Sequence, residues 1–321
     1  MVVFYTLSDF SYVERAIIEG WVWLWFLQRV WSVDKFASLR WYRIRKFDLK
    51  SNITLLILLM LPTQIVFDIV WTYVKYKEGN IVDTSSGIII PKPAFIIVNG
   101  HKVQIWSNEN IILKMITEYM LACSFALQSG TLVLLQTFWS HLADQIGGKP
   151  FMKSWEFKFY VSWVFISMII FPLARLLASH DIILVENIIQ LIFAIELLII
   201  FLLGIRNEKR LKNLLSNIRN QGSPSGRWAI VRIQYFIEMN KYLIFGTLMS
   251  SLGILIICTD AVTRTFRISR SKFLMDLLII NSNVGSLILW VTMILIIYPR
   301  YYTDGMVSYF NSELATNPSN R

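Results

Sequence analysis

Charged and amide side chains inside long apolar stretches are the residues of this chain best placed to do chemistry. Such groups are costly in the hydrocarbon of a membrane, so each one indicates either a binding site or a hydrogen bond to a neighbouring helix. Six of them are expected in the outer part of their stretches, where they would line a ligand or ion cavity: Asp68, Glu118, Arg175, Gln190, Asn281 and Asn283. The alternative, that these groups only bond neighbouring helices, stays open at this stage.

Glu196 differs from these six because it lies near the middle of its apolar stretch. A neutral, protonated carboxyl that bonds another helix and a functional carboxyl both fit this position. The residue types of the sequence do not decide between the two interpretations.

Enzyme signatures are missing from the sequence. His101, His141 and His180 are far apart in the sequence, so no two of them have the spacing of a metal-binding pair. There is also no P-loop, GxSxG or dinucleotide-binding motif. Cys123 and Cys258 both lie in apolar stretches, where small buried side chains are expected rather than a disulfide or a metal site. We therefore expect neither enzymatic activity nor a metal or other cofactor.

The elements that must hold these residues are membrane helices. The chain has 321 residues, 55% of them hydrophobic, with 12 Trp, which is typical of a multi-pass membrane protein and not of a soluble domain. Its net charge of +10 is concentrated between the apolar stretches, where anionic lipid explains it better than nucleic acid does. The bilayer is thus the expected partner, in the plasma membrane or an endomembrane.

The apolar stretches predict an all-α bundle in a single domain of residues 1–310, followed by a short cytoplasmic tail at 311–321. Six stretches are long enough to cross a bilayer core of about 30 Å. They are residues 53–76, 111–139, 159–178, 185–205, 242–262 and 273–298. Small residues at every fourth position in 111–139 indicate close helix packing, so we expect this helix at the centre of the bundle.

Residues 11–33 are ambiguous as a seventh span. Their uninterrupted apolar run is short, so crossing would require Glu19 to reach the outer headgroups while Gln28 and Arg29 extend to the inner ones. Several tryptophans in this stretch also suit the membrane interface. A tilted span and a helix lying in the headgroups both remain open.

Two connections between the helices have a predicted structure. Between the first two clear spans, residues 94–98 and 101–106 flank Asn99-Gly100, the dipeptide that favours a two-residue β-turn, so a small external β-hairpin is expected. Between the spans 185–205 and 242–262, residues 206–232 are strongly basic and keep helical periodicity. Short basic loops stay cytoplasmic, so two helices should project into the cytosol there.

The basic residues of this projecting hairpin are candidates for binding a cytoplasmic signalling protein. They are Arg206, Lys209, Arg210, Lys212 and Arg227.

If residues 11–33 cross, the layout across residues 11–310 resembles that of G-protein-coupled receptors: an outer N-terminus, seven spans, a basic third inner loop and an inner tail. The third span ends in Leu135-Gln136-Thr137-Phe138-Trp139, where the rhodopsin-like class has an acidic residue, Arg and Tyr. The resemblance implies a receptor that senses a small ligand from outside and signals through the basic hairpin. The alternative function is an ion channel or transporter subunit, with Asp68, Glu118, Glu196 and Asn281 along a pathway through the membrane.

Overall fold

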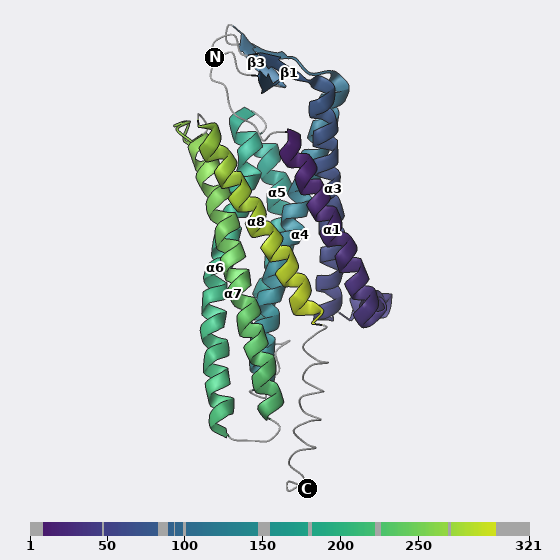
Figure 1. Cartoon of the computed structure of the whole chain (residues 1–321), viewed down its shortest axis with the longest axis vertical. Helices are drawn as coiled ribbons and strands as arrows, with labels where there is room; N and C mark the ends of the chain where they lie inside the picture. The colour runs from purple at the N-terminus through teal and green to yellow at the C-terminus, as the bar shows by residue number, and fades with distance from the viewer. Residues whose placement is uncertain are drawn as a thin grey trace.

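Long helices lying side by side make up most of the computed structural model (Figure 1). The structure describes residues 9–46, 48–82, 89–92, 94–98, 101–146, 155–178, 182–221, 226–268 and 271–299. The long helices are α1 (Asp9–Asp34), α3 (Leu49–Glu78), α4 (Asn108–Ile146), α5 (Trp155–Leu177), α6 (Ile182–Gln221), α7 (Gly226–Val262) and α8 (Lys272–Ile297). Each predicted helical segment therefore lies on a helix of nearly the predicted extent.

Five helices are long and apolar enough to cross a membrane, judged by length and composition. The qualifying ranges are Leu49–Glu78, Asn108–Gln136, Asn187–Arg219, Ile233–Val262 and Lys272–Ile297. Helix α5 contributes a shorter apolar stretch, Ser162–Leu177. Among the described residues, the expectation of six or seven spans is thus met for five helices.

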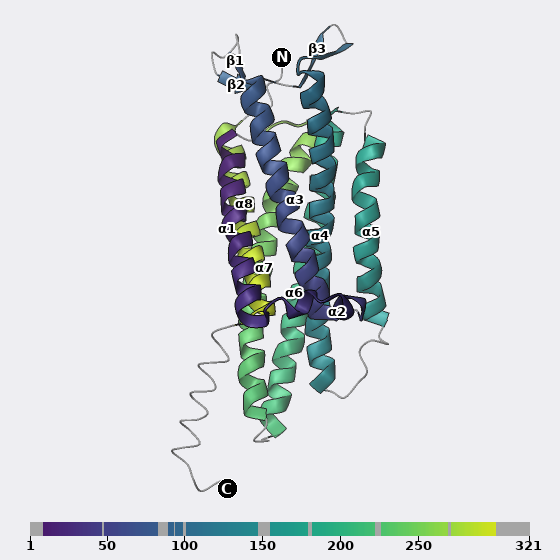
Figure 2. The same cartoon turned by 90° about the vertical axis from the view of Figure 1, so that its right-hand side faces the viewer.

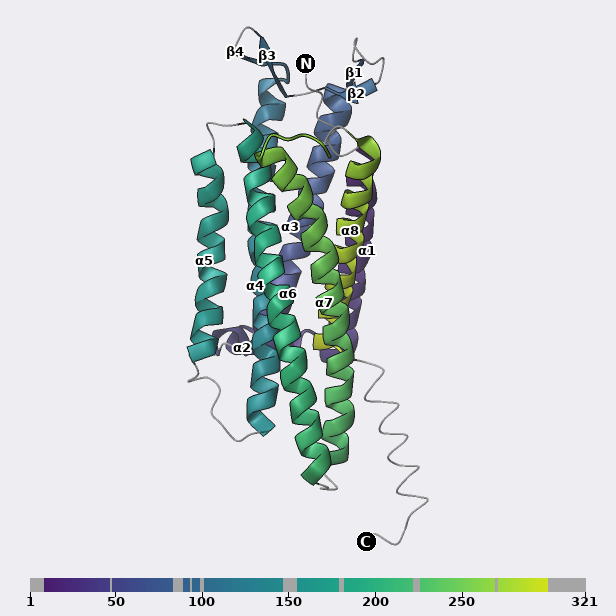
Figure 3. The same ribbon diagram turned by 90° about the vertical axis from the view of Figure 1, so that its left-hand side faces the viewer.

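Helix α4 occupies the centre, where it packs against α3, α5 and α6 (Figures 2 and 3). Ala122 and Ala126 are buried, and a Cβ atom added at Gly130 would come within 2.9 Å of Val164 on α5. The small residues therefore allow the close approach that the sequence predicted. Helix α7 lies between α6 and α8, while α1 runs antiparallel to α3 and also touches α8.

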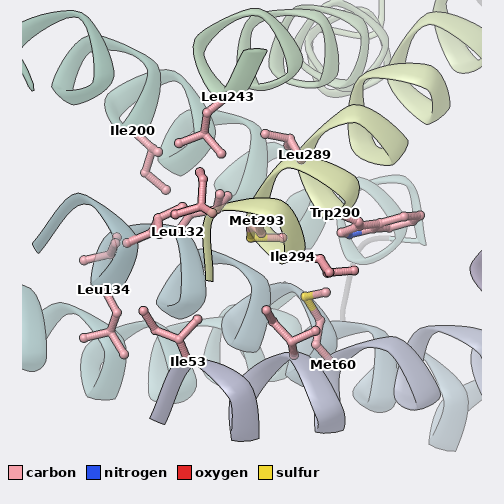
Figure 4. Packing of buried hydrophobic residues seen from close by; sticks show 14 of the residues in the cluster. Ile53, Met60, Leu132, Leu134, Ile200, Leu243, Leu289, Trp290, Met293 and Ile294 are labelled. Carbon is pink, nitrogen blue, oxygen red and sulfur yellow. The ribbon is translucent and has the colours of Figure 1, made fainter. Parts of the chain in front are cut away.

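The core is filled by aliphatic, aromatic and methionine side chains from the helices of the bundle. Ile53 and Met60 of α3 and Leu132 of α4 meet Met293 of α8, and Ile200 of α6 joins the same cluster (Figure 4). All five are at most 2% exposed. Between lipid-embedded helices the close packing of such side chains, and not their removal from water, supplies the attraction.

Helices α7 and α8 approach each other closely through glycine and serine. A Cβ atom at Gly285 would lie 2.6 Å from the Ser250 backbone nitrogen, and one at Gly253 would lie 2.7 Å from the Leu278 carbonyl oxygen. The Ser250 hydroxyl lies 2.8 Å from that of Ser286. These small residues therefore let the two helices approach closely.

Two small β-ribbons cap one end of the bundle, here called the strand end. The predicted hairpin is formed by β3 (Phe95–Val98) and β4 (His101–Gln104), with Val98 opposite His101. Its turn, Asn99-Gly100, lies outside the described residues. A second ribbon, β1 (Asn80–Val82) with β2 (Ile89–Pro91), was not predicted, because strands of three residues leave almost no periodicity to read.

At the opposite end, here called the hairpin end, α6 and α7 extend beyond the other helices (Figure 1). Leu211 and Ile218 of α6 and Ile233 and Phe236 of α7 are buried in this part. The prediction of two long projecting helices is confirmed; the residues between them, 222–225, lie outside the described part. Helix α1 is joined to α3 at this end through η1 (Ala37–Leu39) and α2 (Trp41–Arg45).

Candidate functional site

A buried ion pair joins α1 to α3 towards the strand end. The Arg15 guanidinium donates from Nε to Asp68 Oδ2 at 2.7 Å and from its terminal nitrogen to Asp68 Oδ1. Glu19, one turn further along α1, lies 3.9 Å from Arg15 Nε. Asp68 and Glu19 are both completely buried, whereas the Arg15 side chain is 20% exposed. One partly exposed arginine therefore faces two buried carboxyl groups.

This arrangement corrects the expectation that Glu19 reaches the outer headgroups. Glu19 points into the bundle, and Arg29, which was expected to reach the inner headgroups, is only 8% exposed. Charged residues at i and i+4 share one face of a helix, and on α1 that face packs against α3. The sequence shows the four-residue spacing of Arg15 and Glu19, but only the tertiary structure shows that Arg15 pairs with Asp68.

A layer of aromatic rings and cations connects this ion pair with α4. Tyr12 stacks on Trp71 at 5.9 Å between ring centres, and Trp71 contacts the edge of Trp106. Arg15 lies over the Tyr12 ring at 5.5 Å, and Lys114 of α4 lies 5.7 Å from Trp71. Cation–π contacts of this kind are strengthened when water is excluded.

Lys114 also continues the layer to a second buried ion pair. Its ammonium is 3.8 Å from a carboxylate oxygen of Glu118, whose other oxygen accepts a hydrogen bond from Arg175 of α5. Glu118 and Arg175 are each 8% exposed. Two of the predicted cavity residues are therefore partners of each other.

The remaining predicted cavity residues lie at a different interface. Gln190 of α6 receives a weak contact from the thiol of Cys258 on α7 at 3.8 Å, and Asn281 of α8 donates to the Met249 carbonyl oxygen at 3.0 Å. Asn283 is half-buried on the same helix. The contacts of the other five residues thus divide among the α1–α3, α4–α5, α6–α7 and α7–α8 interfaces.

The predicted partner-binding residues lie on the projecting hairpin. Arg206 and Lys209 are exposed on α6, and Lys212 forms an ion pair with Glu208 at 2.6 Å. Arg210 is half-buried. Arg227 lies in the first turn of α7, and its side chain is outside the described part.

Three amide side chains meet where the projecting hairpin leaves the bundle. Asn207 of α6 donates to Gln136 Oε1 of α4 at 2.6 Å, and Asn240 of α7 donates to the Gly204 carbonyl oxygen at 3.0 Å. All three amides are at most 4% exposed. We call Gln136, Asn207, Asn240 and Gly204 the amide junction; sequence analysis missed it, because amides on separate helices share no spacing.

Tyr298, just after α8, organises the hairpin end of α1, α3 and α8. Its hydroxyl lies 2.8 Å from Thr54 Oγ1, and its carbonyl oxygen accepts a hydrogen bond from Arg29 at 2.7 Å. Lys50 lies over its ring at 4.6 Å. Sequence reasoning had assigned Tyr298 no role.

Asp260, near the end of α7, stabilises the basic connection between α7 and α8. Sequence analysis did not single this residue out. Its carboxylate accepts hydrogen bonds from the backbone of Arg267 at 2.9 Å and Ile268 at 3.1 Å, and from the hydroxyl of Thr265 at 2.6 Å. One buried carboxylate therefore holds this connection at the strand end.

Comparisons with protein families, with curated proteins and with solved structures found no match for this chain. Within the described residues, no three His, Cys, Asp or Glu side chains gather in a way that could hold a metal ion.

Proposed function

We propose that this chain is a receptor-like membrane protein in which α1 and α5 cross the bilayer together with the five longer apolar helices. The exposed side of α1 carries Trp21, Leu24 and Trp31, and its charged groups Glu19 and Arg29 are buried. The exposed large side chains of α5 from Phe165 to Leu177 are likewise apolar. Apolar groups outside and paired charges inside are what a lipid-embedded helix requires.

The proposed function is to sense a small ligand at the strand end and to signal through the basic hairpin. Two connected elements support this proposal. The aromatic and ionic layer at the strand end joins α1, α3, α4 and α5, so a ligand that altered one contact would disturb several helices. At the other end, α6 and α7 continue without a break from the bundle into the projecting hairpin, which on this proposal lies in the cytosol.

The amide junction is the observation that carries the proposal. Gln136 belongs to the central helix α4, and Asn207 and Asn240 belong to the two helices of the projecting hairpin. Buried polar contacts have discrete bonded arrangements, so a shift of α4 would be transmitted to the hairpin. On this proposal the amide junction would be the element with two arrangements that coupling between two sites requires.

Exposed basic side chains at the hairpin suit an acidic surface on a cytoplasmic signalling protein. Replacing Arg206 and Lys209 with alanine should abolish proximity labelling of that partner in cells, while membrane insertion stays unchanged. The matched control replaces Arg43 and Arg45 of α2, which are exposed at the same end. Equal loss in both variants would indicate that charge alone, and not the hairpin, recruits the partner.

The orientation itself has a direct test. An epitope tag placed before Met1 should bind antibody on intact cells if α1 crosses. A tag that is reached only after permeabilisation would leave α1 on the inner side and would remove the layout that resembles G-protein-coupled receptors.

The channel or transporter alternative receives less support. Asp68 pairs with Arg15, Glu118 pairs with Arg175, and Asn281 bonds the backbone of α7. Charges neutralised at separate interfaces suit helix association better than a continuous pathway. Liposomes containing the protein should accordingly remain tight to ions and small solutes; flux that Asp68→Asn abolishes would favour the alternative.

A further inference from the structure

A second polar site lies among α4, α5 and α6, away from both the aromatic layer and the amide junction. It is centred on Glu196 of α6, which is 8% exposed. The hydroxyl of Ser167 on α5 donates to Glu196 Oε1 at 2.7 Å. Ser129 of α4 and Trp163 of α5 are the other polar groups beside the same carboxyl.

Within the part of the chain that the structure describes, several polar atoms of this site have no hydrogen-bond partner, and the carboxyl has no counter-charge beside it. Glu196 Oε2, Ser129 Oγ and Trp163 Nε1 are all buried without a hydrogen-bond partner. A carboxylate in such surroundings would have one completed hydrogen bond and no basic partner among the described residues. An unpaired charge in a medium of low dielectric constant is strongly disfavoured.

We infer that Glu196 is a proton-binding site, in which the neutral carboxylic acid fastens α5 to α4 and α6. A proton on Oε2 turns that oxygen into a donor, and Ser129 Oγ is then the acceptor beside it. Oε1 continues to accept from Ser167. All three helices are thereby joined through one carboxyl group.

The surroundings favour a proton over a metal cation. Trp163 presents an N–H group, which a cation would repel, and a small cation would need several oxygen ligands. Towards the strand end, Phe125 and Phe193 stack at 4.2 Å between ring centres, one turn from Ser129 and Glu196 respectively. Towards the hairpin end, the buried side chains of Leu132 and Ile200 follow.

Among the ionisable side chains of these helices that the structure describes, Glu118 and Arg175 pair with each other towards the strand end. On the neighbouring helix α7, Cys258 contacts Gln190 of α6. Loss of the proton would leave an unpaired charge among α4, α5 and α6, so we expect an arrangement that admits water to the carboxyl to favour the ionised form.

Infrared spectroscopy of the purified full chain in lipid nanodiscs tests this inference. The wild type should show the C=O stretching band of a buried carboxylic acid, and Glu196→Gln should lose it. Glu238→Gln is the matched control because Glu238 is exposed on α7, and it should leave the band unchanged. Ser167→Ala should keep the band but shift it to higher frequency, because one hydrogen bond to the carbonyl oxygen is removed.

Two results would overturn the inference. Identical carboxylic-acid bands in the wild type and Glu196→Gln would mean that the carboxyl is ionised. Stabilisation of the wild type, but not of Glu196→Gln, by added NaCl relative to choline chloride would mean that a cation occupies the site. The Ser167→Ala spectrum gives an independent answer should Glu196→Gln fail to fold. Because none of these readouts involves signalling, they are separate from the test of the proposed receptor function.

Discussion

Arg15 of α1 and Asp68 of α3, 53 residues apart, form a two-pronged ion pair in which the Asp68 carboxylate is completely buried. Paired nitrogen and oxygen atoms in this geometry make the strongest kind of charge-assisted hydrogen bond. The pair explains how α1 can lie along the bundle although its sequence is more charged than that of α3.

Replacing Arg15 with Met should strongly destabilise the protein, because Asp68 and Glu19 would be left without a counter-charge. Removing one member of a buried pair costs about 3 to 5 kcal/mol. The triple variant Arg15→Met, Glu19→Gln, Asp68→Asn should recover much of this loss, since it leaves no buried charge. Thermal unfolding in detergent measures both variants. Arg43→Ala, at an exposed position, serves as the control; a triple variant no better than the single one would contradict this account.

Replacing Gly285 with Ala should disturb the contact between α7 and α8, because the new methyl group would lie 2.6 Å from the Ser250 backbone nitrogen. Backbone cannot give way as a flexible side chain can, so we expect a lower unfolding temperature and an overpacking cost of about 1 to 3 kcal/mol. Gly20→Ala on α1 is the matched control. Nothing lies within 4 Å of its Cβ position, and alanine in a helix is favoured over glycine by roughly 0.5 to 1 kcal/mol. Equal effects at the two glycines would refute the close approach.

Replacing Asn207 with Ala should weaken the amide junction and loosen the projecting hairpin from α4. The change leaves Gln136 Oε1 buried without its donor, at a cost of about 1 to 3 kcal/mol. Amide hydrogen exchange in residues 206–221 should become faster. Asn213→Ala, on the same helix but exposed, should leave exchange unchanged. Unaltered exchange in Asn207→Ala would remove the support that the junction gives to the proposed signalling.

Replacing Tyr298 with Phe should loosen the hairpin end of α8. The variant keeps the ring that packs against Phe26 but loses the hydrogen bond to Thr54, which contributes about 0.5 to 1.5 kcal/mol. Faster exchange should be confined to the last turns of α8. Tyr242→Phe is the control, because Tyr242 is exposed on α7. A change spread evenly over α8 would instead indicate general destabilisation.

The positions of the helices could be predicted from the sequence, because the length of an apolar stretch and the spacing of its small residues are properties of a single segment. Residues 53–76 and 242–262 were predicted as helices, and α3 and α7 contain them. The Asn99-Gly100 signal likewise predicted the β3–β4 pair, since a two-residue turn is a local property. The central position of α4 was also predicted, because small residues at every fourth position allow another helix to approach closely.

The partners of the polar side chains were decided only by the tertiary structure. Asp68 and Glu118 were grouped by depth, yet each has its own arginine on a different helix. Depth along a helix follows from counting residues, whereas the direction a side chain faces depends on how each helix is rotated against its neighbours. That rotation is set by packing across the whole bundle. The sequence by itself therefore determined which helices form and which polar groups they carry, and only the folded arrangement decided that Arg15 meets Asp68 and that Asn207 meets Gln136.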